Sequence, residues 1–339
     1  MDSTNLQKPD NNSVDREEDE DFLFAEQLMY GALMPMVMQA AIKLNVFEIR
    51  SRAPATYLSA SEIASQLPTN KNPNAHIVLD RLLRFLASHS VVTCITQENN
   101  SIMNNGGEVE RLYGLAPVCK YFIKNEDGAS LCPSLLFTND KIPLESWNYF
   151  DNIVLDLGFL AVHEVYNGTD CYEHQVKNPE LNELFNRSMS DDTAIIMKRI
   201  LKKYKGFEGL KVLVDVGVEH VGGDMFVSIP KGNAIFMKWV LHNWSDEQCL
   251  TILKKCYEAL HPDEGKVIVV ETIIPAAPDP NNATRLSYIY DLMMMTFNPN
   301  VKERTEEEFE ALAKKSGFVG IRLACYACSF WLIEFLKMI

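Results

Sequence analysis

The chain has 339 residues, 47% of them hydrophobic, and its 46 Asp and Glu against 32 Lys and Arg give a net charge of −14. This length accommodates one large domain or two ordinary ones. The acidic balance argues against a phosphate-backbone partner, and no apolar stretch reaches the length of a membrane-spanning helix. The first residues do not resemble a signal peptide. We therefore expect a cytoplasmic protein that binds neither nucleic acid nor membranes.

The eight cysteines show no spacing typical of a disulfide framework or a metal site. Cys325 and Cys328 have the C-x-x-C spacing, but they lie in an apolar, strand-like run. Buried, reduced thiols are the favoured interpretation, and we expect no metal.

Residues 1–21 are polar and end in an acidic run, which predicts a disordered tail. Residues 22–130 are expected to form the first domain. Its opening stretch, 22–47, is rich in Leu, Met and Ala at helical spacing, and Pro35 should break or kink that helix. A segment this apolar at the start of a chain suggests a protein partner, although an ordinary core helix would look the same.

The next elements predict a winged-helix arrangement. Two helical patterns are followed by two short strand patterns around a polar turn, at residues 59–67, 74–88, 91–96 and 111–115. DNA binding is not favoured, because the second helix offers only Arg81 and Arg84 as base readers and the net charge is negative. Residues 131–206 are expected to form a mainly helical linker, in which Phe185, Met189 and Met197 share one apolar face.

Residues 207–339 alternate between strand and helix patterns, which predicts a doubly wound α/β sheet. The apolar run 234–237 leads into Lys238, Trp239, His242 and Asn243, and a helix then begins at Ser245 with a capping box to Gln248. His242 is thus expected where a strand ends and a helix begins, the edge at which such sheets bind ligands. A histidine there is suited to proton transfer near neutral pH, although a purely structural loop histidine is the alternative.

Two carboxylates are expected beside His242. Glu271 ends the buried strand pattern 266–270, and Glu303 precedes a helix capped by Thr305 and Glu308. If the two strands are parallel, Glu271 emerges at the same edge as His242. Carboxylates in this position would hold the imidazole in one tautomer, as a general base requires. Considered alone, Glu271 and Glu303 would each be interpreted as a solvent-exposed acid in a loop.

These residues carry a resemblance to the plant small-molecule O-methyltransferases, the caffeic acid 3-O-methyltransferase group in particular. The matching segments cover most of the chain from about Phe22 onward and include 78–84, 111–114, 207–226, 238–247, 269–275 and 302–309. The resemblance implies a Rossmann-like methyltransferase sheet preceded by an all-α, winged-helix dimerisation domain. It also implies a homodimer in which residues 22–47 intertwine with the neighbour.

The resemblance further implies methyl transfer from S-adenosylmethionine to a phenolic hydroxyl of a caffeic-acid-like phenylpropanoid. The implied catalytic residues are His242, Glu271 and Glu303, and the implied cofactor-binding residues are Gly217, Asp224, Met225 and Lys238. The implied substrate-binding residues are Phe185, Met189, Trp239, Asn243, Met294 and Asn298. The sequence departs from the family pattern at Asp192, where the family has His, and near Phe137 and Thr138.

One large departure concerns the cofactor. The strand pattern 212–216 ends at Gly217, but no glycine-rich turn, helix and second strand with a terminal acid follow, and the chain runs into a strand-like stretch at 218–221. Compared with the family, roughly thirty residues, about one βαβ unit, are absent. The sheet is thus expected to be incomplete at its first crossover. A second hypothesis is therefore that the chain is a catalytically impaired, dimerising homologue of these enzymes. A third interpretation, a nicotinamide-dependent dehydrogenase, is disfavoured because the G-x-G-x-x-G motif is missing.

Overall fold

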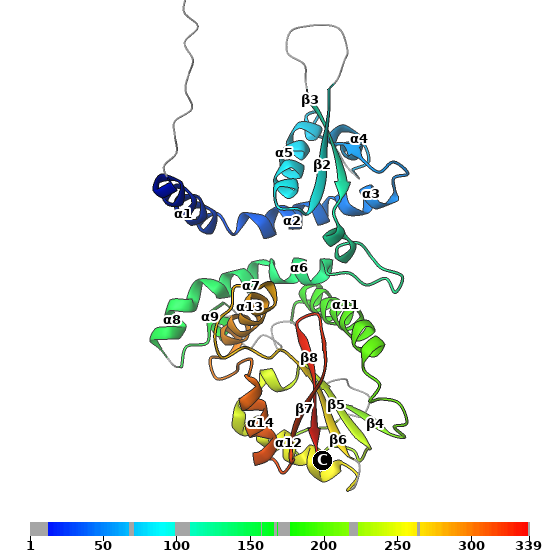
Figure 1. Cartoon of the computed structure of the whole chain (residues 1–339), viewed down its shortest axis with the longest axis vertical. Helices are drawn as coiled ribbons and strands as arrows, with labels where there is room; N and C mark the ends of the chain where they lie inside the picture. Colours follow the sequence, from blue (N-terminus) through cyan, green and yellow to red (C-terminus); the bar gives the residue numbers. More distant parts are fainter. Residues whose placement is uncertain are drawn as a thin grey trace, which may run out of the picture. The chain divides into compact units, whose positions relative to one another are not determined.

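The computed structural model describes residues 13–67, 71–98, 109–156, 158–165, 168, 177–216, 223–262 and 265–337. The chain divides into two compact units, Met1–Asn125 and Glu126–Ile339 (Figure 1). No helix within these described ranges is both long and apolar enough to cross a membrane.

The first unit begins with helix α1 (Ser13–Met29), so the expectation of a disordered tail up to residue 21 is wrong for its last nine positions. The acidic run falls in the first half of this helix, where the helix dipole favours negative charge. Residues 1–12 lie outside the described ranges. Helix α2 (Leu33–Lys43) follows α1 after a break of three residues, and Pro35 sits in its first turn, where proline is tolerated.

The remaining elements of the first unit form the predicted winged-helix pattern. Strands β2 and β3 pair antiparallel, and β1 adds to the other side of β3. Helix α5 buries Leu79, Leu83 and Leu86, one face of the predicted helical period. The bounds are α3 (Val46–Arg52), β1 (Leu58–Ser59), α4 (Ala60–Ala64), α5 (Ala75–Ser88), β2 (Val92–Glu98), β3 (Val109–Leu115) and η1 (Pro117–Tyr121).

The second unit opens with helices and continues into a sheet. The helices before the sheet are α6 (Cys132–Thr138), α7 (Lys141–Ser146), η2 (Trp147–Tyr149), α8 (Phe150–Leu155), α9 (Ala161–Val165) and α11 (Pro179–Lys203). Pro179 opens α11 and the Asn178 side chain caps it by accepting from the Leu181 N–H. The elements that follow are β4 (Leu213–Val216), β5 (Ala234–Lys238), η3 (Leu241–Asn243), α12 (Asp246–Ala259), β6 (Lys266–Glu271), α13 (Asn282–Phe297), α14 (Glu306–Lys315), β7 (Gly320–Ala327) and β8 (Phe330–Leu336).

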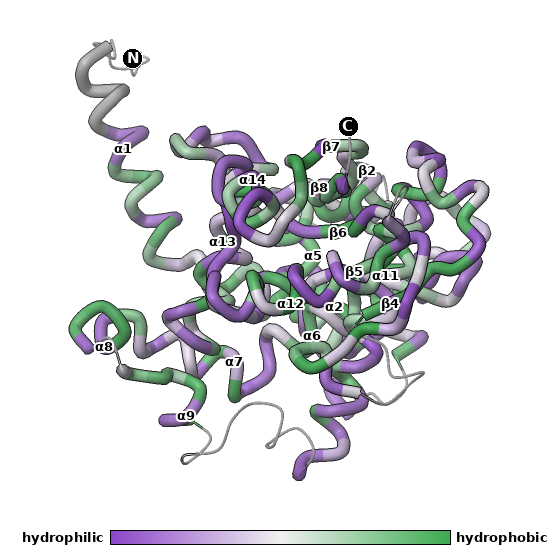
Figure 2. The backbone as a smooth tube through the Cα atoms, turned by 90° about the horizontal axis from the view of Figure 1, so that it is seen from below, coloured by the Kyte–Doolittle hydropathy of each residue, from purple (hydrophilic) through white to green (hydrophobic). Residues whose placement is uncertain are grey.

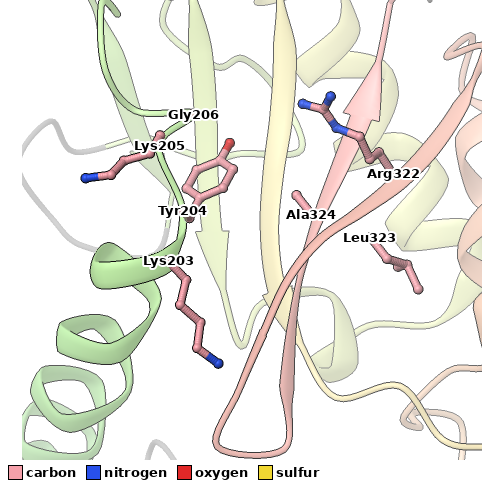
Figure 3. Close-up of a pocket in the computed structure, with 7 residues that line it drawn as sticks. All are labelled: Lys203, Tyr204, Lys205, Gly206, Arg322, Leu323 and Ala324. Atoms are coloured by element: carbon pink, nitrogen blue, oxygen red, sulfur yellow. The ribbon is translucent and has the colours of Figure 1, made fainter.

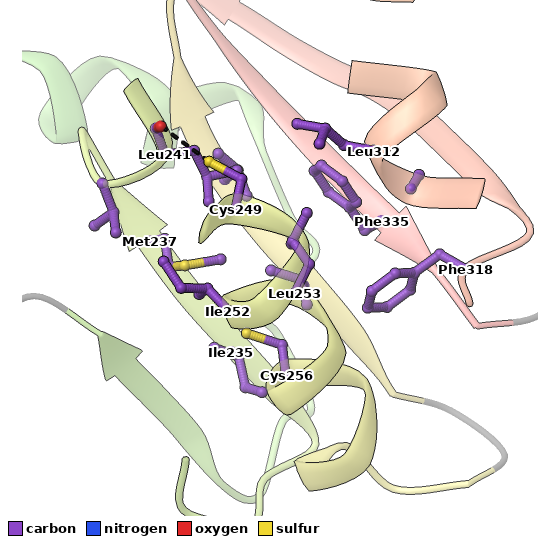
Figure 4. Close-up of a cluster of buried hydrophobic side chains, with 14 of the residues drawn as sticks. Ile235, Met237, Leu241, Cys249, Ile252, Leu253, Cys256, Leu312, Phe318 and Phe335 are labelled. Carbon is purple, nitrogen blue, oxygen red and sulfur yellow. Dashed lines mark hydrogen bonds between the residues drawn. The ribbon is translucent and has the colours of Figure 1, made fainter. Parts of the chain in front are cut away.

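The five strands lie in the order β4-β5-β6-β8-β7. Strands β4, β5 and β6 are parallel, as expected, and β8 is antiparallel to both of its neighbours. On one face, alternate residues such as Ile235 and Met237 pack against α12 and α14 (Figure 4). On the other face, Ile268 and Val270 pack against residues of α11. Both faces of the central strands are therefore buried, which places polar groups at the strand ends.

Strand β4 pairs directly with β5, and no helix occurs between them in the part of the crossover that the structure describes, residues 223–233. Gly217 and the strand expected at 218–221 lie outside the described residues. Within those limits, the sheet agrees with the expectation of a Rossmann-like fold that is incomplete at its first crossover.

Candidate active site

The chain turns sharply after β5 and carries His242 on that turn. Trp239 takes a left-handed backbone conformation (φ 57°), which is uncommon for a bulky residue and is associated with functional sites. The Asn243 side chain donates from Nδ2 to the Trp239 carbonyl at 2.9 Å. Helix α12 then starts with the predicted capping box between Ser245 and Gln248. The turn is thus fixed at both ends.

Arg304 holds the same turn from the opposite side. Its side chain is 1% exposed, and it donates from Nη1 to the Leu241 carbonyl (2.9 Å) and from Nη2 to the Trp244 carbonyl (2.8 Å). Its Nε donates to the Asp246 carboxylate at 3.0 Å. Because His242 lies between the two carbonyls, Arg304 positions the segment that carries it. The sequence reasoning missed this residue, although Arg304 directly follows Glu303 in the chain.

His242, Glu271 and Glu303 come together at the carboxyl ends of the parallel strands. The His242 Nδ1 lies 2.8 Å from Oε1 of Glu303 and 3.8 Å from Oε2 of Glu271. Glu271 is fully buried, and its Oε1 accepts the backbone N–H groups of Val240 and Leu241, both at 2.9 Å. With Nδ1 donating to Glu303, Nε2 of the imidazole is the nitrogen that can accept a proton.

The charges of this cluster act on one another. Burial alone would lower the pKa of His242, but the charge of Glu271 and the hydrogen bond to Glu303 outweigh it and raise that pKa above 6.5. Burial raises the pKa of Glu271, while His242 and the backbone N–H groups of Leu241 and Val240 oppose the rise. The arrangement therefore favours a protonated imidazole once a proton has arrived.

Two carboxylate oxygens in the cluster, Glu271 Oε2 and Glu303 Oε2, are buried without a hydrogen-bond partner. Two buried acids accompany one imidazole, so the cluster suits a ligand with positive charge or proton donors. The three side chains each offer a ligand atom, and these atoms lie within 4.8 Å of one another. This spacing would also accommodate a metal ion.

Lys238 ends β5 next to this cluster. Burial lowers the pKa of Lys238 to about 7, although the charges of Asp192 and Glu271 raise it. Its Nζ lies 2.8 Å from the centroid of the Trp239 ring, a close cation–π contact. Asp192 is on α11, where it accepts from the Ser134 hydroxyl at 2.8 Å, and burial raises its pKa to about 6. Asp192 thus acts electrostatically on the site from the linker helix.

The predicted cofactor residues Asp224 and Met225 lie in a turn before β5. Asp224 is exposed, and its Oδ1 accepts from the Phe226 N–H at 2.8 Å. Phe226 packs edge-to-face on Trp244 with ring centroids 4.9 Å apart, which holds this turn against the segment that carries His242. Gly217 is not among the described residues, so the structure places only three of the four predicted cofactor residues.

The predicted substrate residues lie on three segments. Phe185, Met189 and Asp192 recur at helical spacing on α11, and the Phe185 ring packs at a tilt against Phe137 of α6, with ring centroids 5.2 Å apart. Met294 is on α13, and Asn298 ends that helix with its Oδ1 accepting from the Asn300 N–H at 2.9 Å. Trp239 packs on Phe330 of β8 at 5.2 Å. The side-chain amides of Asn243 and Asn298 therefore both form hydrogen bonds that stabilise the turns in which they lie.

A separate cavity of about 360 Å³ is lined by residues 203–206, at and just after the end of α11, and 322–324 of β7 (Figure 3). Lys266, which starts β6 and so lies at the opposite end of that strand from Glu271, donates to the Tyr204 hydroxyl in this lining. Tyr204 and Arg322 line it, and both bind the fully buried Glu334, which also accepts from Lys266 Nζ at 2.7 Å. Burial would raise the pKa of Glu334, but these hydrogen bonds lower it. All the buried charge here is compensated, which is typical of a structural network.

Comparison with known proteins agrees with this architecture. Residues 26–125 match the model of the O-methyltransferase dimerisation domain, and residues 147–218 and 217–319 match that of the O-methyltransferase domain. The chain belongs to the O-methyltransferase family. It is 47% identical over 355 residues to caffeic acid 3-O-methyltransferase of Clarkia breweri, which covers 93% of this chain and 94% of the relative. The enzyme of the same name from Capsicum annuum is 46% identical over 374 residues, covering 99% and 100%.

Other members of the family are also similar. The (iso)eugenol O-methyltransferase of Clarkia breweri is 46% identical over 353 residues, covering 93% of this chain and 94% of the relative. Among solved structures, human N-acetylserotonin methyltransferase superposes with a TM-score of 0.74 at 15% identity, covering 98% and 99%. The mitomycin 7-O-methyltransferase MmcR superposes with a TM-score of 0.69 at 20% identity, covering 96% and 100%. At these identities the structures establish the fold alone.

The comparisons also locate a gap in this chain. The two matches to the O-methyltransferase domain meet at residues 217–218, as expected for a chain that lacks part of that domain there. The Clarkia alignment has 355 positions, but 93% of 339 residues is only about 315, so about 40 positions are occupied by the relative alone. Both facts agree with the absence of a unit after Val216.

Proposed function

We propose that this O-methyltransferase transfers a methyl group from S-adenosylmethionine to a phenolic hydroxyl of a caffeic-acid-like phenylpropanoid, with His242 as the general base. The observation that carries the proposal is the pairing of His242 Nδ1 with Glu303, which leaves Nε2 to accept a proton at the ligand-binding edge of the sheet. The names of the relatives support O-methylation and the acceptor class. The structure of human N-acetylserotonin methyltransferase in complex with S-adenosylmethionine supports the donor.

The chemistry follows from the acidity of the acceptor. A phenol has a pKa of about 10 and is mostly protonated at neutral pH, so its oxygen is a weak nucleophile. His242 would remove the phenolic proton as the oxygen bonds to the methyl carbon, while the bond from that carbon to the donor sulfur would break and leave its electron pair on sulfur. The charge of the resulting imidazolium is stabilised by Glu303 at 2.8 Å and Glu271 at 3.8 Å. A positioned base of this kind contributes roughly 10²–10⁴-fold to a rate.

The described residues fit part of the donor site. When bound, S-adenosylmethionine supplies an electrophilic methyl group on a positively charged sulfur, which suits the excess of buried carboxylate around His242. Lys238, Asp224 and Met225 would hold one side of the donor, and Gly217 would be the fourth contact. Phe185, Met189, Trp239, Asn243, Met294 and Asn298 would surround the acceptor, with residues 131–206 as the linker that covers it.

A homodimer is part of the proposal. Figure 2 shows apolar residues in the coloured part of α1, and the side chains of residues 19–29 are exposed in the isolated chain, among them Phe22 (63%), Phe24 (61%) and Leu28 (67%). Exposed apolar surface of this kind marks an interface with another protein. The match of residues 26–125 to a dimerisation domain favours a second copy as that partner.

The alternative is a catalytically impaired homologue, and the gap after Val216 favours it. The sequence lacks the glycine-rich turn and the ribose-binding acid, and each polar group lost costs roughly 1.5–3 kcal/mol of binding. Two such losses weaken donor affinity by about two to four decades relative to an intact family member. Calorimetric titration with S-adenosylhomocysteine measures this directly, with the Clarkia enzyme as the intact control.

Low-micromolar binding by this chain would show that the gap is tolerated and that the impaired-homologue hypothesis is wrong. If donor binding is weak but labelled methyl groups still reach a phenolic acceptor at high donor concentration, the proposed reaction stands. If no transfer occurs even at a donor concentration that saturates the site, the proposed function fails.

A further inference from the structure

The Glu303 carboxylate is held less firmly than its neighbour in the cluster. Within the described part of the chain, its one hydrogen bond comes from His242 Nδ1 to Oε1, and its Oε2 is buried without a hydrogen-bond partner. Glu271 differs, because its Oε1 accepts the backbone N–H groups of Val240 and Leu241. The position of Glu303 beside His242 therefore depends on where the backbone of Glu303 is held.

Asp291 holds that backbone. The Glu303 N–H donates to Asp291 Oδ1 at 2.9 Å, although the two residues are 12 positions apart in the chain. Asp291 lies in the interior of α13, whereas Glu303 lies in the loop that precedes α14. The hydrogen bond thus ties a loop residue of the site to a regular helix, the kind of element that positions side chains most precisely.

Burial makes the hydrogen bond consequential. Glu303 is only 3% exposed, and a buried backbone N–H without an acceptor is rare in folded proteins. If the Asp291 oxygen were removed, the loop would have to shift until the Glu303 N–H reached water or another acceptor. That shift would carry the Glu303 carboxylate away from His242 Nδ1.

The charge of Asp291 is a separate matter from its oxygen. Burial raises the pKa of Asp291, and the charge of Glu303 also raises it, while the Glu303 N–H and the charge of Lys302 act in the opposite direction. The two carboxylates therefore repel each other. An amide oxygen would accept the same N–H without this repulsion, so the oxygen and the charge can be tested one at a time.

We propose that Asp291 is a positioning residue for methyl transfer, which holds the backbone of Glu303 so that the Glu303 carboxylate can orient His242. The three residues act in series, from α13 through the loop before α14 to the turn after β5. The role in catalysis rests on the proposed function. The effect of Asp291 on the pKa of His242 does not, because it can be measured without turnover.

Two substitutions of Asp291 separate the hydrogen bond from the charge. Asp291→Asn and Asp291→Leu both remove the negative charge, but only asparagine keeps an oxygen that can accept the Glu303 N–H. NMR titration of protein with labelled histidine gives the pKa of His242, whose signal among the seven histidines is identified by its absence from His242→Gln. Because Glu303 raises that pKa, we expect a lower value in Asp291→Leu and the wild-type value in Asp291→Asn.

The rate of methyl transfer at saturating donor and acceptor is the second measurement. Asp291→Leu should lower kcat by up to about 10²-fold, as a small displacement of a catalytic group can, with little change in the KM for S-adenosylmethionine. Asp291→Asn should keep the wild-type kcat. If the wild type transfers no methyl group, the proposed function fails, and the pKa of His242 in the two variants still decides whether Asp291 positions Glu303.

Circular dichroism and thermal melts check that the variants are folded, and Asp291→Ala, which also lacks the oxygen, serves if Asp291→Leu is not. A wild-type pKa of His242 in the folded variant without the oxygen would overturn the proposal, and so would a wild-type kcat. Equal losses in Asp291→Asn would also overturn it, because the charge of Asp291 and not its hydrogen bond would then be responsible.

Discussion

Replacing Arg304 with lysine should both destabilise the second unit and slow catalysis. The guanidinium binds the carbonyls of Leu241 and Trp244 and the carboxylate of Asp246 with three different nitrogens. Lysine keeps the charge but has a single nitrogen, which cannot reproduce a planar fork. At least one of the two carbonyls is then left without its donor.

The size of the effect follows from the burial of the Arg304 side chain, which is 1% exposed. A buried polar group without a partner costs about 1–3 kcal/mol, so the free energy of unfolding should fall by about that amount. His242 lies between the two carbonyls, and a small displacement of a catalytic group can cost about 10²-fold in rate. The stability loss is expected whether or not donor binding is impaired.

Urea denaturation followed by tryptophan fluorescence measures the first effect, because Trp239 and Trp244 lie on either side of His242 in the clamped turn. Turnover at saturating donor measures the second. The matched control is Arg285→Lys, the same chemical change on the exposed surface of α13, which should leave both unchanged. A wild-type urea midpoint together with wild-type turnover in Arg304→Lys would refute the positioning role.

Two further predictions concern the cluster at the strand ends. Glu303→Gln removes the carboxylate charge that accepts the hydrogen bond from His242 Nδ1, so the pKa of His242 should fall. The pH at which methyl transfer is half-maximal should therefore move downward. An unchanged or higher half-maximal pH would contradict the assigned hydrogen bond. Treatment with EDTA should leave the rate of methyl transfer unchanged, because His242 needs no metal to accept the proton. A loss of rate that added divalent ion restores would show that His242, Glu271 and Glu303 hold a metal ion instead.

Much of the site could be predicted because its residues follow recognisable local signals. The apolar run before Lys238 and the Ser245 capping box define a strand and a helix start, and parallel pairing of β5 with β6 then brings Glu271 to the edge that carries His242. Sequence periodicity also located helix α5 and the β2–β3 hairpin. These features depend on short-range patterns and on one topological rule.

The parts that were missed depend on long-range contacts. Arg304 is 58 positions from Asp246, and nothing in its neighbourhood indicates that its guanidinium is buried. The electrostatic link between Asp192 and Lys238 joins α11 to β5 and appears only when the linker helix is in place. The polar composition of the acidic run at 15–21 predicts a disordered tail, but the run lies at the start of α1, where its charge is compatible with a helix.

The most direct test of the proposed mechanism is the rate of methyl transfer from labelled S-adenosylmethionine to a caffeic-acid-like phenol, measured across pH for wild type and His242→Gln. The pKa of His242 is raised, and only the neutral imidazole accepts a proton, so the wild-type rate should increase with pH through a midpoint above 6.5. The variant should lose roughly 10²–10⁴-fold in rate and that midpoint, with a nearly unchanged thermal melt. A wild-type rate in His242→Gln, or the same pH midpoint in both proteins, would contradict the assignment of His242 as the base.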